Sequence, residues 1–223
     1  MTIELDSNFT VFPLINRGNV YIDMGDFSSG IADYTEAIRI GCKAPSSNAY
    51  IAKAYHNRGL AYKELEDYDA AIADFTQAIW LNPINFCVFC DRGNAYSDVG
   101  DYDRAISDYT HAIQMVPCYP NAFHNRGCAY AETGEFDKAL ADFAETINLR
   151  PDDASAYFNQ GLAHREMGND DLAIVSFSKA IEIEPEMDRA WHNRGLAHQR
   201  IGDTASASSD LAMASKLGYY SQS

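Results

Sequence analysis

Cysteine and histidine side chains occur together in the middle of the sequence, where their types would suit metal binding or thiol chemistry. Cys87 and Cys90 stand three residues apart, a spacing that places both on one face of a helix. His124 and Cys128 follow further along the chain. Three cysteines and one histidine match the ligand types of a zinc site. Free cysteine is otherwise a small apolar side chain. We therefore expect no metal or other cofactor, and keep a metal-binding or redox-responsive protein as the alternative.

Sequence patterns for catalysis are absent. No glycine-rich phosphate loop, His-Glu-x-x-His pair or Gly-x-Ser-x-Gly turn occurs. The chain has 17 Lys and Arg against 32 Asp and Glu, a formal net charge of −15. Such an acidic chain repels the phosphates of nucleic acids and anionic lipids. We expect a protein that is not an enzyme and that binds neither nucleic acid nor membranes.

Segment composition indicates the compartment. No apolar stretch reaches the length of a membrane span. Residues 1–10 have no basic segment followed by an apolar one, so we expect no secretory signal. The five cysteines show no paired pattern, which suits a reducing compartment. These observations favour a cytoplasmic location.

Arginine and aspartate recur together along the chain. The pairs are Arg17 with Asp33, Arg58 with Asp74, Arg92 with Asp108, Arg126 with Asp142, and Arg194 with Asp210. Where Gln160 replaces the arginine, Ser176 replaces the aspartate. Because the two positions change together, we predict an ion pair between neighbouring helices in each of the five cases, and a neutral contact between Gln160 and Ser176. A row of arginines open to an acidic ligand is the alternative, which we favour less because partly buried charges need partners.

These arginines belong to a repeated string. Asn-Arg-Gly occurs at residues 16–18, 57–59, 125–127 and 193–195, with near copies at 91–93 and 159–161. From Gly59 onward the glycine returns every 34 residues, whereas Gly18 precedes Gly59 by 41. A period of this length is typical of stacked helix pairs. The first repeat therefore carries seven extra residues, and residues 41–47 have the composition of a loop.

The second repeat, residues 52–85, shows the pattern most fully. Counted from Ala52, the fourth, eighth, eleventh, twentieth, twenty-fourth, twenty-seventh and thirty-second places hold Tyr55, Gly59, Tyr62, Ala71, Phe75, Ala78 and Pro83. This pattern resembles the tetratricopeptide repeat family, and the resemblance covers roughly residues 11–221. It implies an all-α fold, a right-handed α-α superhelical solenoid of six antiparallel helix-pair repeats.

The expected organisation is a short N-terminal extension followed by the six repeats. The ranges are 1–10 for the extension, then 11–51 with the seven-residue insertion, 52–85, 86–119, 120–153, 154–187 and 188–221. Gly59 and Ala71 lack bulk, so we predict that the two helix backbones of a repeat approach closely there. In the last repeat Ser208 and Ser215 stand where the second repeat has Ile72 and Ile79, so its second helix is expected to cap the stack.

The resemblance also implies a concave groove lined by the first helix of each repeat. The sixth place is Asn in five repeats, and an amide that both donates and accepts hydrogen bonds can hold an extended peptide backbone. Bonding of these amides to a neighbouring helix is the alternative. The predicted groove residues are Asn16, Asn19, Lys53, His56, Asn57, Asp91, Asn94, His124, Asn125, Asn159, Arg165 and Asn193.

The predicted function is a protein–protein interaction scaffold that binds an extended peptide or a helix of a partner in this groove. Some family members clamp a C-terminal carboxylate with lysine and arginine. Here Ile15 replaces that lysine and Asp91 replaces that arginine, so we do not expect this clamp. Self-association of the chain is a further alternative, because solenoid ends and grooves can pair with each other.

Overall fold

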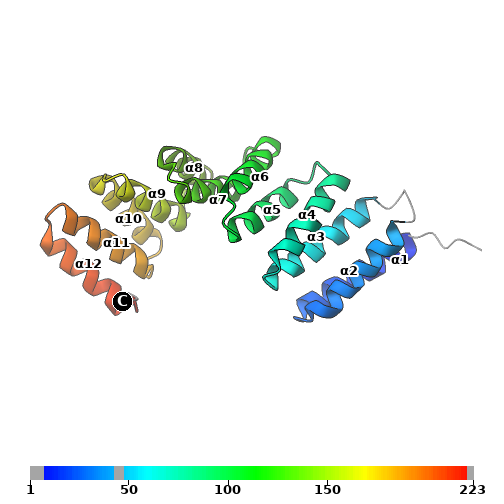
Figure 1. The fold of residues 1–223 in the computed structure, drawn as a ribbon. Coiled ribbons are helices and arrows are strands. Elements are labelled where there is room, and N and C mark those ends of the chain that lie inside the picture. Colours follow the sequence, from blue (N-terminus) through cyan, green and yellow to red (C-terminus); the bar gives the residue numbers. More distant parts are fainter. Residues whose placement is uncertain (1–7, 43–47, 220–223) are drawn as a thin grey trace, which may run out of the picture. The chain divides into compact units, whose positions relative to one another are not determined.

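The computed structural model describes residues 8–42 and 48–219 (Figure 1). These residues form helices and contain no strand. In chain order, the helices begin with α1 (Asn8–Asp23), α2 (Phe27–Gly41), α3 (Asn48–Glu64), α4 (Tyr68–Leu81), α5 (Phe86–Asp98) and α6 (Tyr102–Met115). They are followed by α7 (Pro120–Glu132), α8 (Phe136–Leu149), α9 (Ala154–Glu166), α10 (Asp170–Ile183), α11 (Asp188–Arg200) and α12 (Thr204–Lys216).

The helices fall into two compact units, residues 1–117 and 118–223, called here the N-terminal and C-terminal units. In the N-terminal unit α1 packs on α2, α3 on α4, and α5 on α6, and each pair packs on the next. The C-terminal unit repeats this arrangement with α7 to α12. The order and pairing of the helices confirm the fold class expected from the sequence, an all-α solenoid of six helix pairs.

A tight turn joins the two helices of each pair. Gly100 and Gly134 both have φ of 77°, the left-handed conformation that commonly ends a helix. One residue later, the Asp101 side chain caps the following helix by accepting a hydrogen bond from the backbone N–H of Arg104. Glu66 occupies the glycine position in the α3–α4 turn with φ of 60°, so this turn carries backbone strain that the glycine turns lack.

The recurring glycine of the first helix makes room for an aromatic ring. A Cβ added at Gly59 would lie 2.7 Å from the Phe75 ring, and one added at Gly127 would lie 2.8 Å from the Phe143 ring. Both rings are fully buried. At Gly127 the backbone oxygen of Ala139 would also lie 3.3 Å from the added Cβ, so the second helix brings both a ring and its backbone close to the recurring glycine. In the last pair an aliphatic side chain, Leu211, stands against Gly195.

The ends of the repeats agree only partly with the predicted boundaries, which stay predictions. Helix α1 begins at Asn8, inside the segment expected as an extension, and α3 begins at Asn48, before the expected start of the second repeat. Most of the predicted insertion, residues 43–47, lies outside the described residues. Ser208 and Ser215 of α12 are exposed. No described helix combines the length and the apolar character needed to cross a lipid bilayer.

Candidate functional site

Arginine–aspartate pairs join the two helices of five repeats. In each pair Nε and Nη2 of the arginine donate to the two carboxylate oxygens of the aspartate, over 2.7 or 2.8 Å. The fifth repeat differs, because the Ser176 hydroxyl donates to Gln160 Oε1 over 3.0 Å. The pair of Arg17 is the most solvated, since 61% of that side chain is exposed. These arginines therefore hold the repeats together, and their charge is already matched.

Three of these arginines also reach the preceding repeat. Arg58 Nη1 donates to the Thr35 hydroxyl, Arg92 to Thr76, and Arg194 to Ser178. Arg58, Arg92 and Arg194 thus each link three helices of their unit. Our reading of the sequence missed this third partner, although a signal exists. The hydroxyl recurs at the twenty-fifth place, and Ala144 replaces it just before the repeat in which Gln160 replaces arginine.

The asparagines of the predicted groove bond largely to neighbouring helices. In the N-terminal unit, Asn19 Oδ1 accepts from Asn57 Nδ2 over 2.8 Å and from the Tyr34 hydroxyl over 2.7 Å. Burial raises the pKa of Tyr34 to about 12, so the hydroxyl keeps its proton. Asn94 accepts from Tyr109 in the same way. For Asn19, Asn57 and Asn94, the alternative therefore applies: their amides bond to neighbouring helices.

The C-terminal unit shows the same behaviour. Asn159 Nδ2 donates to Cys128 Sγ over 3.4 Å and lies 3.2 Å from His124 Nε2. Asn193 accepts from Arg165 and donates to the backbone oxygen of Arg189. These contacts join first helices of adjacent repeats, since His124 and Cys128 belong to α7 and Asn159 to α9. They leave Asn159 Oδ1 without a partner among the side chains that the structure describes.

The remaining predicted groove residues differ in exposure. Asn16 and Lys53 are exposed, and Lys53 has no hydrogen bond or ion pair with any described residue. His56 Nε2 lies 2.7 Å from Asp91 Oδ2, so the one acidic member of the sixth-place row has a histidine neighbour. Asn125 is half-buried. These residues therefore include side chains that already bond to a neighbouring helix, such as His56, and exposed side chains without such a bond, such as Lys53.

The cysteines are free thiols, and the structure gives no support to the metal-binding alternative. Within residues 8–42 and 48–219, no group of three or more His, Cys, Asp or Glu side chains could hold a metal ion. Burial raises the pKa of Cys90 to about 12 and that of Cys128 to about 11. Burial also raises the pKa of Cys87. These thiols stay protonated at neutral pH, which disfavours nucleophilic and redox chemistry.

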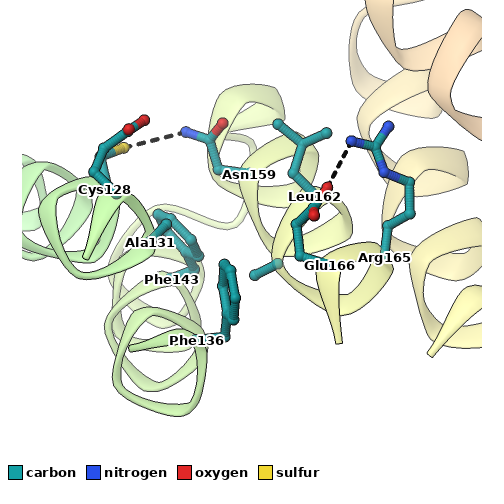
Figure 2. A pocket seen from close by; sticks show the side chains of 10 residues that line it. Cys128, Ala131, Phe136, Phe143, Asn159, Leu162, Arg165 and Glu166 are labelled. Carbon is teal, nitrogen blue, oxygen red and sulfur yellow. Dashed lines mark hydrogen bonds and ion pairs between the residues drawn. The ribbon is translucent and has the colours of Figure 1, made fainter. Parts of the chain in front are cut away.

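A pocket of about 360 Å³ opens between α7, α8 and α9 (Figure 2). We call it the α7–α9 pocket. Its lining residues are Cys128, Ala131, Glu132, Phe136, Phe143, Asn159, Leu162, Ala163, Arg165 and Glu166. In Figure 2 the rings of Phe136 and Phe143 stand between the helix of Cys128 and the helix of Leu162. The pocket therefore combines an aromatic and aliphatic interior with charged groups from α7 and α9.

The equivalent positions of the N-terminal unit contain an ion pair. There Lys63 at the twelfth place of the second repeat reaches Asp98 at the thirteenth place of the third, with Nζ 3.7 Å from Oδ2. The C-terminal unit has Ala131 and Glu166 at these places. The predicted groove residues include Asn159 and Arg165 of this pocket but not the rings of Phe136 and Phe143 in its interior. The signal was the change from lysine to alanine at the twelfth place.

The N-terminal unit has a different pocket, of about 340 Å³, on α3 and the α4–α5 connection. It is more polar than the α7–α9 pocket, because its lining includes three asparagine amides together with Lys53 and His56. The lining residues are Ala49, Ala52, Lys53, His56, Asn57, Ala78, Asn82, Asn85 and Val88. The two units therefore present different chemistry on the first-helix side.

Comparison with known proteins gives one consistent result. Family models described as tetratricopeptide repeats match residues 14–40, 52–85, 93–134 and 124–188. No curated protein matches the chain. Among solved structures, MamA is 26% identical over 71% of this chain and 93% of its own, with a TM-score of 0.69.

Two further structures extend the comparison. YrrB, described as a TPR protein with an unusual peptide-binding site, is 25% identical over 82% of this chain and 90% of its own, with a TM-score of 0.71. A tetratricopeptide repeat protein from Parabacteroides merdae is 19% identical over 95% of this chain and 81% of its own, with a TM-score of 0.81. At that identity the last likeness concerns the fold alone.

Proposed function

Because the chain belongs to the tetratricopeptide repeat family, we propose that it is a protein-interaction scaffold. It binds an extended segment or a helix of a partner protein along the first helices, and it binds without catalysing a reaction. The observation that carries this proposal is the α7–α9 pocket, which opens on first-helix residues of two consecutive repeats.

The lining of this pocket suits an anchoring side chain of a partner. Sites that bind ligands combine an apolar interior with a few polar groups that fix orientation. Here Phe136, Phe143 and Leu162 supply the interior, and Glu132 and Glu166 supply polar groups. A buried anchor in such a pocket commonly carries most of the affinity of an interface. The similarity to YrrB, a TPR protein with a peptide-binding site, supports the same role.

The partner's backbone finds hydrogen-bonding groups beside the pocket. Asn159 Oδ1 has no partner among the described side chains and accepts from a peptide N–H in this proposal. In the N-terminal unit, the exposed side chains of Lys53 and Asn16 offer further hydrogen-bonding groups. The other predicted groove residues bond to neighbouring helices, which preorganises this surface: Asn19, His56, Asn57, Asp91, Asn94, His124, Arg165 and Asn193. Asn125 lines the surface as well.

Selection from a random 12-residue peptide library tests this function, with the full chain as bait. Binding of the selected peptides is then compared between two variants. Ala131→Phe fills the α7–α9 pocket, and Ala141→Phe places the same ring on an exposed position of α8. We expect Ala131→Phe to weaken binding about tenfold, which corresponds to ~1.4 kcal/mol, and Ala141→Phe to change it little.

A second comparison examines the amide row. Replacing Asn57, Asn125 and Asn159 together by alanine should also weaken the selected peptides. Peptides that bind all of these variants as they bind the unchanged chain would place recognition on the second helices and overturn the proposal.

A further inference from the structure

The two units place different side chains at one pair of positions, and the difference concerns a positive charge. In the N-terminal unit the Lys63 ammonium reaches from α3 toward the Asp98 carboxylate on α5. In the C-terminal unit the carboxylate is kept as Glu166, but the lysine is replaced by Ala131. The N-terminal unit therefore supplies its own basic side chain at a place where the C-terminal unit has a pocket.

Carboxylate oxygens of the α7–α9 pocket remain available. Glu132 is exposed, and neither of its carboxylate oxygens bonds to a described residue. Glu166 Oε1 accepts from Arg165 over 2.9 Å, which leaves its second oxygen without a partner in the described chain. The interior between them consists of Phe136, Phe143 and Leu162. Aromatic faces and carboxylates together suit a long side chain that ends in a cation.

From this juxtaposition we propose that the α7–α9 pocket takes a lysine or arginine side chain of the partner, a proposal that rests on the proposed function. The aliphatic stem of that side chain packs on Phe136 and Leu162. Its charged end lies at the carboxylates of Glu132 and Glu166, as the ammonium of Lys63 lies at Asp98 in the N-terminal unit. The net charge of −15 favours the approach of a basic segment.

Arg165 is the one cation of the pocket lining, and its guanidinium is already engaged. Its Nη1 donates to Asn193 Oδ1 and its Nη2 donates to Glu166 Oε1. Only 21% of this side chain is exposed. One cation against two carboxylates leaves the pocket with an excess negative charge. A basic ligand is therefore matched by charge, and an acidic ligand is not.

Four small probes test the proposal on the full chain: the Nα-acetyl N-methylamides of arginine, lysine, norleucine and glutamate. Titrations are followed by NMR of ¹³C-labelled methyl groups, with Leu162 and Ala163 as the reporters of the pocket. Probes of this size reach dissociation constants on the order of 1 mM in a favourable site. We expect arginine and lysine to bind at least about fivefold more tightly than norleucine, and glutamate not to bind.

Two variants separate charge from shape. Ala131→Lys copies the N-terminal unit and should abolish the shifts caused by arginine and lysine, because its own ammonium takes the place of the ligand. Glu132→Gln combined with Glu166→Gln keeps the pocket open and should remove the preference over norleucine. Asp137→Asn combined with Glu145→Gln makes the same change of net charge on exposed positions of α8, and it should leave the preference intact.

The possible results separate this proposal from the proposed function. Equal affinity for norleucine and arginine, tighter binding of glutamate, or no shift with any probe at 50 mM would overturn the assignment of a basic side chain. The peptide selection with Ala131→Phe would still stand as the test of the scaffold role. Melting temperatures of all variants by circular dichroism show whether a lost signal reflects unfolding. If Ala131→Lys unfolds, the double glutamine variant decides.

Discussion

Helices α3 to α6 in the N-terminal unit and α7 to α10 in the C-terminal unit share their internal contacts and differ on the side of the first helix of each repeat. Arg58 pairs with Asp74 as Arg126 pairs with Asp142. Gly59 faces Phe75 as Gly127 faces Phe143. On that side, the Lys63 ammonium pairs with the Asp98 carboxylate in the N-terminal unit, and Ala131 borders a pocket in the C-terminal unit. In the proposed scaffold, separate positions of the repeat therefore serve folding and recognition.

The largest effect should follow from breaking an ion pair that both units share. Arg58→Gln leaves the Asp74 carboxylate unpaired, and only 7% of that side chain is exposed. An unpaired buried charge is costly, so we expect the free energy of unfolding to fall by about 3 kcal/mol. Urea denaturation followed by circular dichroism measures this change.

The neutral pair of the fifth repeat provides the control for that experiment. Combining Arg58→Gln with Asp74→Ser copies Gln160 and Ser176 and removes both charges. We expect the double variant to recover stability to within about 1 kcal/mol of the unchanged chain. A double variant as unstable as the single one would mean that Arg58 acts mainly through its hydrogen bond to Thr35 and its position over the rings of Tyr55 and Tyr62.

Glycine substitutions should show a smaller effect, and they compare two repeats within the C-terminal unit. A Cβ at Gly127 would lie 2.8 Å from the ring of Phe143, whereas one at Gly195 would lie 3.0 Å from the aliphatic Leu211. Because a packed ring yields less than a leucine side chain, Gly127→Ala should cost about 2 kcal/mol and Gly195→Ala less than about 1 kcal/mol. Thermal and urea unfolding of the two variants give the values. An equal loss of stability in the two variants would show that the Phe143 ring is not what excludes a Cβ at Gly127.

Part of this organisation could be predicted from the sequence, because repeats within one chain act as internal controls. The ion pairs were accessible since arginine and aspartate change together, down to Gln160 and Ser176. Tyr55, Tyr62 and Phe75 were recognisable as aromatic residues around the close contact at Gly59, but the pattern alone does not say which of them is the partner of the glycine. That partner, Phe75, comes from the following helix.

The α7–α9 pocket escaped prediction for a different physical reason. A pattern of residues shows which side chains are present, whereas a cavity depends on which space they fail to fill. Ala131 looks unremarkable alone and gains meaning only beside Lys63. Similarly, the sequence indicated that the amide of Asn159 can hold a peptide. Its hydrogen bond to Cys128 could not be predicted, because that bond depends on how α7 packs against α9.

The turn at Glu66 offers a gain in stability of about 1 kcal/mol. Glu66 has φ of 60°, where the other described turns of this kind have glycine. Glu66→Gly relieves the strain of a left-handed conformation, which outweighs the greater entropy of glycine in the unfolded chain. Gly134→Ala is the matched reverse change in the C-terminal unit and should destabilise by a similar amount. Opposite signs in the two unfolding experiments are the expected outcome, and equal signs would refute this reading of the turns.

Acidification should affect the C-terminal unit through its histidines, with the smallest effect of this series. Burial lowers the pKa of His124, His164 and His192 below the ordinary 6.5. As the pH falls below about 6.5, these histidines therefore bind protons more readily in the unfolded chain than in the folded chain. Stability is complete above about pH 6.5 and falls as the pH drops through the lowered pKa values.

A tyrosine variant isolates one of these histidines. His164→Tyr introduces the residue that Tyr62, Tyr96 and Tyr130 hold at the same place of other repeats. Its loss of stability between pH 7.5 and 5.5, measured by urea denaturation, should be smaller than that of the unchanged chain. An identical loss in both proteins would show that His164 does not contribute.

The most direct measurement is a crystal structure of the chain with a peptide selected from the random library. We expect the peptide to lie along the first helices, with a lysine or arginine side chain between Phe136 and Leu162 and its charged end at Glu132 and Glu166. A peptide bound along the second helices, or an empty α7–α9 pocket beneath a bound peptide, would contradict the proposed recognition site.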